Sequence, residues 1–275
     1  MRVNTNVVAI NSRAKLDRNI SEVDRENRRL ATGDRINKAA YDPAGLIISE
    51  NMKARIRSYG QAQRNANDSV SLIQVAEGAL GTIQEMAIRM KELAMQSAND
   101  TLGDEDRAYV NGEYQNMKNE IKRIVSSTKF NGRDLLDTNS GNYQFQVGIH
   151  GDGPGQQVNY DMGKVIRSAD KLMARGSHIT TKGSSQVSLN AVNDMLKEVS
   201  GARAFLGATQ NRVQSTIQNL QISQENTAAA NSRIRDTDVA QSTAQRAIST
   251  IKTNAATGFL SHANGLPDKA KLLLE

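Results

Sequence analysis

The chain has 275 residues and a net charge of +6, and it contains four Phe, six Tyr, no Trp and no Cys. So few bulky aromatic side chains favour thin helical layers over a β-sandwich or a deep enzyme fold. The absence of cysteine excludes disulfide scaffolds, thiolate zinc sites, iron–sulfur clusters and cysteine nucleophiles.

The first predicted element is an amphipathic helix within residues 1–33. Its apolar positions recur at steps of three or four residues, so they share one face of the helix. These positions are Leu16, Ile20, Val23 and Leu30. A connector at 34–45 follows, because Pro43 and Gly45 are typical of a break between helices.

The positive charge is concentrated at this end of the chain. Residues 1–66 carry 13 basic and 7 acidic side chains, a balance of +6, so the rest of the chain is balanced. Basic and acidic residues alternate and aromatic residues are scarce, which favours a solvated or intersubunit helix face and argues against nucleic acid as a partner. No apolar run approaches the roughly 20 residues of a membrane span. The N-terminus also lacks the continuous apolar core of a cleavable signal peptide, so we expect export, if any, by another route.

Residues 46–230 form the predicted rod domain. Two long segments and a shorter one at 104–127 place apolar residues at heptad spacing, which requires a facing helix at coiled-coil geometry. The first seam consists of Ala76, Ala79, Ile83, Met86, Met90, Leu93 and Ser97. The last consists of Val192, Met195, Val199, Ala202, Leu206, Thr209, Val213, Ile217 and Leu220.

A small β insertion interrupts the rod at about 130–185. Tyr143, Phe145 and Val147 alternate with polar residues, and Val158 and Tyr160 alternate again beyond a glycine-rich stretch at 151–155. This pattern predicts a β-hairpin. Residues 161–185 are weakly patterned, which predicts a loop or a short hairpin there.

The C-terminal end mirrors the N-terminal one. A polar connector at 231–241 precedes a terminal helix at 242–275, whose stripe contains Ala244, Ile248, Ile251, Ala255 and Phe259. The predicted fold is therefore mainly α, a long antiparallel helical coiled-coil rod with a small β-hairpin insertion. We expect the terminal helices to be disordered in the free subunit and to fold when neighbouring copies cover them, because a lone helix of this length is marginal. Pairing of the two helices within one chain is the alternative.

The sequence contains no arrangement that predicts catalysis. His150, His178 and His262 stand alone, without the partner at i+3 or i+4 that a zinc site on a helix needs. The 151–155 stretch lacks the following helix and the Lys-Ser/Thr pair of a phosphate-binding loop. We therefore predict a protein that is not an enzyme and that has no metal and no cofactor.

Several motifs, in the same order and at similar spacing, resemble bacterial flagellins over nearly the whole chain. They are LATGDRINKAAYDPAG at 30–45, QAQRNAND at 61–68, EGAL at 77–80, KELAMQSAN at 91–99, FNG at 130–132, LGATQNR at 206–212, IRDTD at 234–238 and ANGLP at 263–267. The resemblance implies a structural subunit that polymerises into the helical flagellar filament for motility. It further implies secretion to the flagellum without a cleaved signal, with both terminal helices in an inner layer.

The resemblance also implies partners and sites. Besides many copies of the chain itself, the partners are a flagellar export chaperone, hook-associated and cap proteins, and a host Toll-like flagellin receptor. The polymerisation residues are Leu16, Ile20, Val23, Leu30, Ala244, Ile248, Ile251 and Phe259. The chaperone anchors are Ile248, Ile251, Phe259, Leu260 and Leu266. The receptor-type surface is Arg89, Leu93, Gln96 and Glu113, which we expect on one exposed strip.

Two other functions stay open at this point. A hook–filament junction protein of the flagellum shares helical ends but joins rather than polymerises. A cytoplasmic coiled-coil adaptor is the more distant alternative, and it would not need the β insertion.

Overall fold

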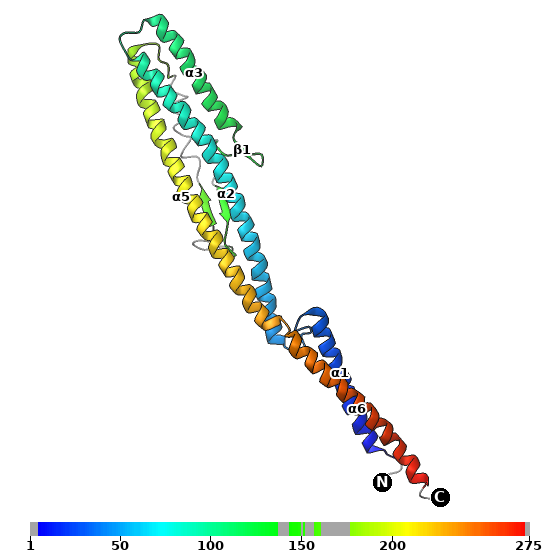
Figure 1. Ribbon diagram of the computed structural model, residues 1–275. Coiled ribbons are helices and arrows are strands. Elements are labelled where there is room, and N and C mark those ends of the chain that lie inside the picture. The colour runs from blue at the N-terminus through cyan, green and yellow to red at the C-terminus, as the bar shows by residue number, and fades with distance from the viewer. Residues whose placement is uncertain (1–4, 137–142, 150, 152–156, 161–176, 273–275) are drawn as a thin grey trace. The chain divides into compact units, whose positions relative to one another are not determined.

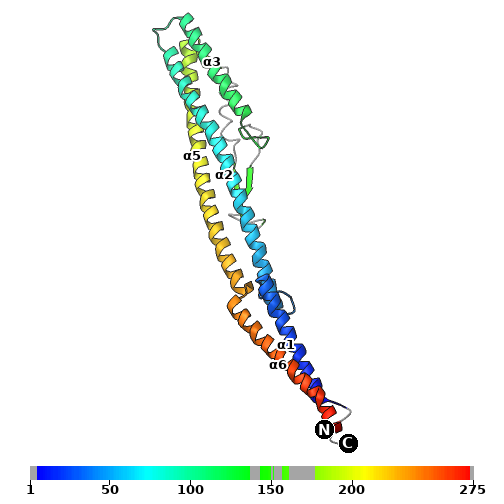
Figure 2. The same ribbon diagram turned by 45° about the vertical axis from the view of Figure 1, so that its right-hand side comes forward.

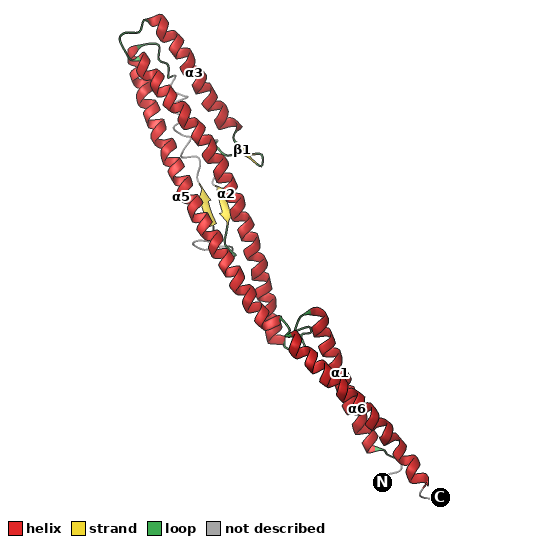
Figure 3. Cartoon of the chain, in the orientation of Figure 1, coloured by secondary structure: helices red, strands yellow, loops and turns green. Residues whose placement is uncertain are grey.

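Long helices account for most of the computed structural model, which describes residues 5–136, 143–149, 151, 157–160 and 177–272 (Figure 1). The helices are α1 (Val7–Thr32), α2 (Pro43–Ser97), α3 (Asp104–Ser127), α5 (Lys182–Arg235) and α6 (Val239–Leu272). The strands are β1 (Lys129–Phe130), β2 (Arg133–Asp134), β3 (Tyr143–Gln146) and β4 (Gln157–Tyr160). The predicted mainly α fold with a small β insertion is confirmed (Figure 3).

The chain divides into two compact units, 1–56 with 225–275, and 57–224. In the second unit, α2 and α5 lie side by side and run in opposite directions, as Figures 1 and 2 both show. The predicted seam of α5 is buried from Val192 to Leu220, except that Ile217 is only half-buried. On α2, a second buried row lies beside the predicted seam and consists of Ile73, Leu80, Ala87 and Ala94. We attribute this wider apolar face to packing in one core with residues of both α3 and α5.

The predicted hairpin is present and packs on the long helices. Strands β3 and β4 are antiparallel, with Phe145 opposite Val158. Val147 and Val158 are buried together with Ala66 of α2 and Val213 of α5. A second hairpin, β1–β2, turns at 131–132 and was not expected from the sequence, because strands of two residues have no visible periodicity. Most of the glycine-rich stretch at 151–155 and of the loop predicted up to 185 lies outside the described residues, and α5 already begins at Lys182.

Local chemistry explains where the helices of the first unit begin and end. Gly33 ends α1 in a left-handed conformation, φ 74°, and its N–H donates to Arg29 O at 2.8 Å. Asp42 accepts a 2.8 Å hydrogen bond from Gly45 N, and Pro43 is the first residue of α2, where a missing N–H costs nothing. A Cβ on Gly45 would lie 2.3 Å from Asp42 Oδ2 and 2.8 Å from Ile36 Cδ1, so a larger residue here would displace these side chains, the Asp42 cap included.

The break between α5 and α6 is shorter than the predicted connector at 231–241. Helix α5 continues to Arg235 and α6 starts at Val239, with Asp238 accepting a 3.0 Å hydrogen bond from Gln241 N. Polar composition suggested a loop, but the segment contains neither Gly nor Pro, and polar residues alone do not end a helix. Among the described residues, no helix is long and apolar enough to cross a membrane.

Candidate polymerisation surface

Helices α1 and α6 pair within one chain, in the first compact unit. The buried face of α6 repeats every seven residues and is made of small side chains: Ser242, Ser249, Ala256 and Ala263, of which Ala256 is half-buried. Small residues let two helices approach closely, and such a repeat forms a narrow seam. Asn6 Nδ2 donates to Ala263 O at 2.7 Å at one end of the seam. The structure therefore shows the intramolecular pairing that the sequence left as the alternative to disordered ends.

The predicted polymerisation residues divide into two groups. On α1, Leu16, Val23 and Leu30 are half-buried at intervals of seven residues, which places them in the seam with α6. Ile20 is outside the seam and 43% exposed. The four α1 residues were predicted to form one stripe. Ile20 does not lie in the seam with the other three, because the heptad position of the seam is Asn19, one residue earlier.

On α6, every predicted polymerisation residue lies outside the seam. Ala244, Ile248, Ile251 and Phe259 are exposed, and Ile251 and Phe259 expose 67% and 70% of their surface. Their spacing of three or four residues places them on one flank of α6, beside the row of small residues. Helix α6 thus has two rows, one covered by α1 and one apolar and uncovered. We call Ala244, Ile248, Ile251, Ala255 and Phe259 the α6 stripe.

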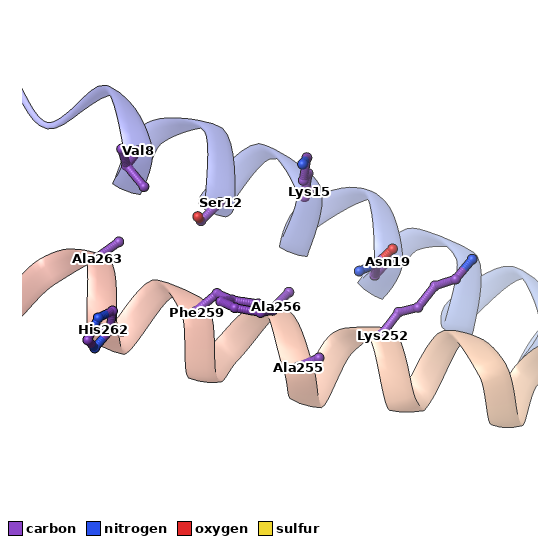
Figure 4. Close-up of a pocket in the computed structure, with 10 residues that line it drawn as sticks. All are labelled: Val8, Ser12, Lys15, Asn19, Lys252, Ala255, Ala256, Phe259, His262 and Ala263. Atoms are coloured by element: carbon purple, nitrogen blue, oxygen red, sulfur yellow. The ribbon is translucent and has the colours of Figure 1, made fainter.

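A groove of about 520 Å³ runs between the two helices near their ends. Figure 4 shows Val8 of α1 and Ala263 of α6 pointing toward one another across it, with Phe259 lying along its floor beside Ala256. Lys15 points away from α6, and Lys252 reaches toward the α1 side. The apolar part of this groove continues the α6 stripe toward α1.

Arg235 fixes the connectors to each other within the first unit. Its Nε lies 3.0 Å from Asp34 Oδ2, and its NH1 bonds Glu50 Oε1. The hydrogen bonds that the guanidinium donates to Glu50 and Asp34 raise its pKa, so it stays charged at any pH at which the protein folds. The backbone adds an antiparallel bridge between Asp34 and Asp236, with Arg35 N donating to Arg235 O at 2.6 Å. Sequence reasoning assigned Arg235 no role, since partners about 190 residues apart leave no local pattern.

The receptor-type residues lie in the second unit, and one of the four is not on the exposed surface where it was predicted. Arg89 of α2 forms a 2.8 Å ion pair with Glu113 of α3 and a 3.1 Å pair with Glu92. The hydrogen bonds that Arg89 donates, to Glu113 first and then to Glu92, raise its pKa. Gln96 is exposed. Leu93 was expected on the same exposed strip and is 1% exposed, in the core between the helices. The prediction was wrong for Leu93 because four residues along a helix advance it by about 40°, here from the surface into the seam.

The chaperone anchors largely coincide with the α6 stripe. Ile248, Ile251 and Phe259 are exposed and Leu260 is half-buried. The side chain of Leu266 lies outside the described part of the chain. The small-residue row of α6 was missed, although its period of seven was readable as Ser242, Ser249, Ala256 and Ala263 in the sequence.

Within the described ranges, no group of three or more His, Asp or Glu side chains could hold a metal ion. The features that the structure brings together are helix faces and ion pairs between helices. Such features serve association with other helices.

Comparison with known proteins gives a consistent family assignment. Residues 3–140 match the bacterial flagellin N-terminal helical region, and residues 189–273 match the bacterial flagellin C-terminal helical region. The chain is 40% identical to a flagellin of Halalkalibacterium halodurans and 35% identical to a flagellin of Bacillus subtilis, in both cases over 100% of each chain. It is 32% identical to a flagellar filament 31.3 kDa core protein of Treponema maltophilum, again over the full length of both.

Solved structures agree with this assignment. The crystal structure of Bacillus cereus flagellin superposes with a TM-score of 0.51 at 25% identity, covering 57% of this chain and 88% of that one. A protein described as a flagellar hook-associated protein of Vibrio parahaemolyticus superposes with a TM-score of 0.58 at 18% identity, covering 71% of this chain and all of that one. The second likeness shows a shared fold only.

Proposed function

The chain belongs to the bacterial flagellin family, and on this premise we propose that α1 and α6 form the part of a filament subunit that neighbouring copies cover. The family model matches and the full-length relatives identify the chain as a structural subunit of the bacterial flagellar filament. The three sequence relatives described above are named flagellin or filament core protein, which favours a filament subunit over a hook–filament junction protein or a cytoplasmic adaptor.

The observation that carries the proposal is the exposed α6 stripe. An apolar row that stays uncovered after α6 has paired with α1 is an interaction surface, because monomeric proteins rarely expose such contiguous patches. Identical copies that bind through different surfaces, head to tail and without closing a ring, grow into an open helical fibre. The α6 stripe, together with Ile20 of α1, is the surface that assembly would bury. Leu16, Val23 and Leu30 would act indirectly, by holding α1 on α6.

A flagellar export chaperone is the proposed partner of the α6 stripe before assembly. An amphipathic helix with anchors at intervals of three and four residues fits an apolar groove of a partner. The anchors would be Ile248, Ile251, Phe259, Leu260 and Leu266. Chaperone and neighbouring subunit would then compete for one face, which keeps the subunit unpolymerised until export. Secretion without a cleaved signal peptide, and contacts with hook-associated and cap proteins, are parts of the same proposal that rest on the family membership.

A truncation separates this surface from the rest of the chain. A chain that ends at Arg235 lacks α6, and we expect it to lose chaperone binding, by at least about 100-fold, because burial of three large apolar anchors contributes several kcal/mol. Titration calorimetry with the purified chaperone measures the change. Equal binding by the truncated and full-length chains would exclude α6 as the docking segment.

Recognition by a host Toll-like flagellin receptor is a further proposal, restricted to the residues that the structure exposes. We expect Arg89→Ala to lower the response of reporter cells by about tenfold, a size typical of a central charged contact. Arg123→Ala is the matched control, because Arg123 is also an exposed arginine that pairs with a glutamate three residues away, Glu120 at 2.5 Å. If reporter cells respond to Arg89→Ala as strongly as to Arg123→Ala, Arg89 is not part of the receptor-type surface.

A further inference from the structure

A polar pocket of about 350 Å³ lies at the N-terminal end of α6, within the first compact unit. Three guanidinium groups line it, from Arg25, Arg29 and Arg35, and Thr237 and Ser242 contribute hydroxyl groups. The pocket is separate from the α6 stripe and from the groove beside Phe259, and neither the filament function nor the chaperone proposal uses it.

Two hydroxyl groups of this pocket have no hydrogen-bond partner among the described residues. Thr237 Oγ1 is buried and unpaired. Ser242 is 7% exposed, and its hydroxyl makes no hydrogen bond to the described chain, whereas the hydroxyl of the next residue, Thr243, donates to Val239 O at 2.7 Å. A buried hydroxyl without a partner costs free energy, so Thr237 Oγ1 indicates an acceptor that one isolated chain does not supply. The Ser242 hydroxyl, which has no partner in the described chain either, lines the same pocket.

The charges around the pocket favour an anion as that acceptor. Glu26 is buried and accepts from Arg29 at 2.9 Å and from Arg25 at 3.4 Å, so one carboxylate faces two cations. Asp238 is the other acid of the lining, and it is already hydrogen-bonded to Gln241 N as the N-cap of α6. With Arg35, three cations face two carboxylates. Each guanidinium carries five N–H donors, so donors remain beyond these contacts.

The end of α6 adds to this preference. The N-terminus of a helix carries a partial positive charge and attracts anions. Ser242 lies in the first turns of α6, a helix of 34 residues. We propose that this pocket binds a small tetrahedral oxyanion, inorganic phosphate or sulfate, held by the hydroxyl groups of Thr237 and Ser242 and by the arginines of α1 and the connector. The bound anion contacts both α1 and α6, so it stabilises the pair by mass action.

Equilibrium dialysis with radiolabelled inorganic phosphate tests the site. The full-length chain is used both in its soluble form and as assembled filaments, so that binding is measured in whichever form pairs α1 with α6. Chloride keeps the ionic strength constant. We expect saturable binding with one phosphate per chain in at least one form. Unlabelled sulfate should displace the phosphate at a comparable concentration, and chloride should not.

The variants remove the hydroxyl groups or one cation. We expect Thr237→Val with Ser242→Ala to weaken phosphate binding about tenfold, the size expected for hydrogen bonds to a charged group. Arg25→Gln, which removes one guanidinium, should weaken binding by a similar factor. The controls are Thr243→Ala and Arg246→Gln, an exposed hydroxyl and an exposed cation on α6, and they should bind phosphate normally. The proposal is overturned by an absence of saturable binding in both forms, or by equal binding in the site variants and the controls.

Discussion

We expect aspartate at both Ile248 and Ile251 to abolish filament growth and to leave the fold of the single chain unchanged. Ile248 is 46% and Ile251 67% exposed on the paired chain, so the substitutions open no cavity in its core. In the proposed assembly the neighbouring copy covers the same positions, so each carboxylate would be buried against apolar surface without a partner. The loss of two buried isoleucines alone is about 3–6 kcal/mol per subunit, which raises the critical concentration for growth by at least about 100-fold.

Sedimentation of polymer seeded with short filaments measures this effect, and circular dichroism confirms that the helices remain. Thr250→Asp is the matched control, because Thr250 is exposed on α6 between the two isoleucines and hydrogen-bonds only Arg246 O in its own helix. If the double variant and the control have the same critical concentration for growth, assembly does not use the α6 stripe.

The second large effect concerns Leu93, which the heptad seam predicts to be buried and the receptor-type surface predicts to be exposed; the structure buries it. Leu93→Ala is expected to lower the free energy of unfolding by about 2–5 kcal/mol, because it opens a cavity in the core shared by α2, α3 and α5. Met95→Ala, two residues along the same helix, should change it by less than about 0.5 kcal/mol, since Met95 is 57% exposed. Urea unfolding followed by circular dichroism compares the two variants.

This pair also governs how a receptor assay is interpreted. A weaker response to Leu93→Ala would reflect lost folding, because a side chain that is 1% exposed cannot contact a receptor in the folded chain. If Leu93→Ala and the parent chain have the same free energy of unfolding, Leu93 is not in the core. Leu93 would then again be a candidate for the receptor-type surface.

Periodicity was sufficient for the helices and for most of the core. The heptad steps from Val192 to Leu220 all fall on the seam of α5, and the apolar alternation around Phe145 and Val158 forms the expected strand pair. A regular helix or strand converts residue spacing directly into a face, so these features follow from local geometry. The family resemblance was likewise carried by local motifs, and the family matches confirm it.

The sequence by itself determined where the long helices lie, apart from the length of the break between α5 and α6, and which apolar residues share a face. It could not determine which apolar face is covered, because coverage depends on the neighbouring element. Only the tertiary structure placed Ser242 and Ser249 against α1 and left Ile251 and Phe259 outside. It alone brought Arg235 to Asp34 and Glu50, and Thr237 and Ser242 to three arginines. These contacts join residues that lie about 200 positions apart, and the spacing of residues along a helix says nothing about a partner at that distance.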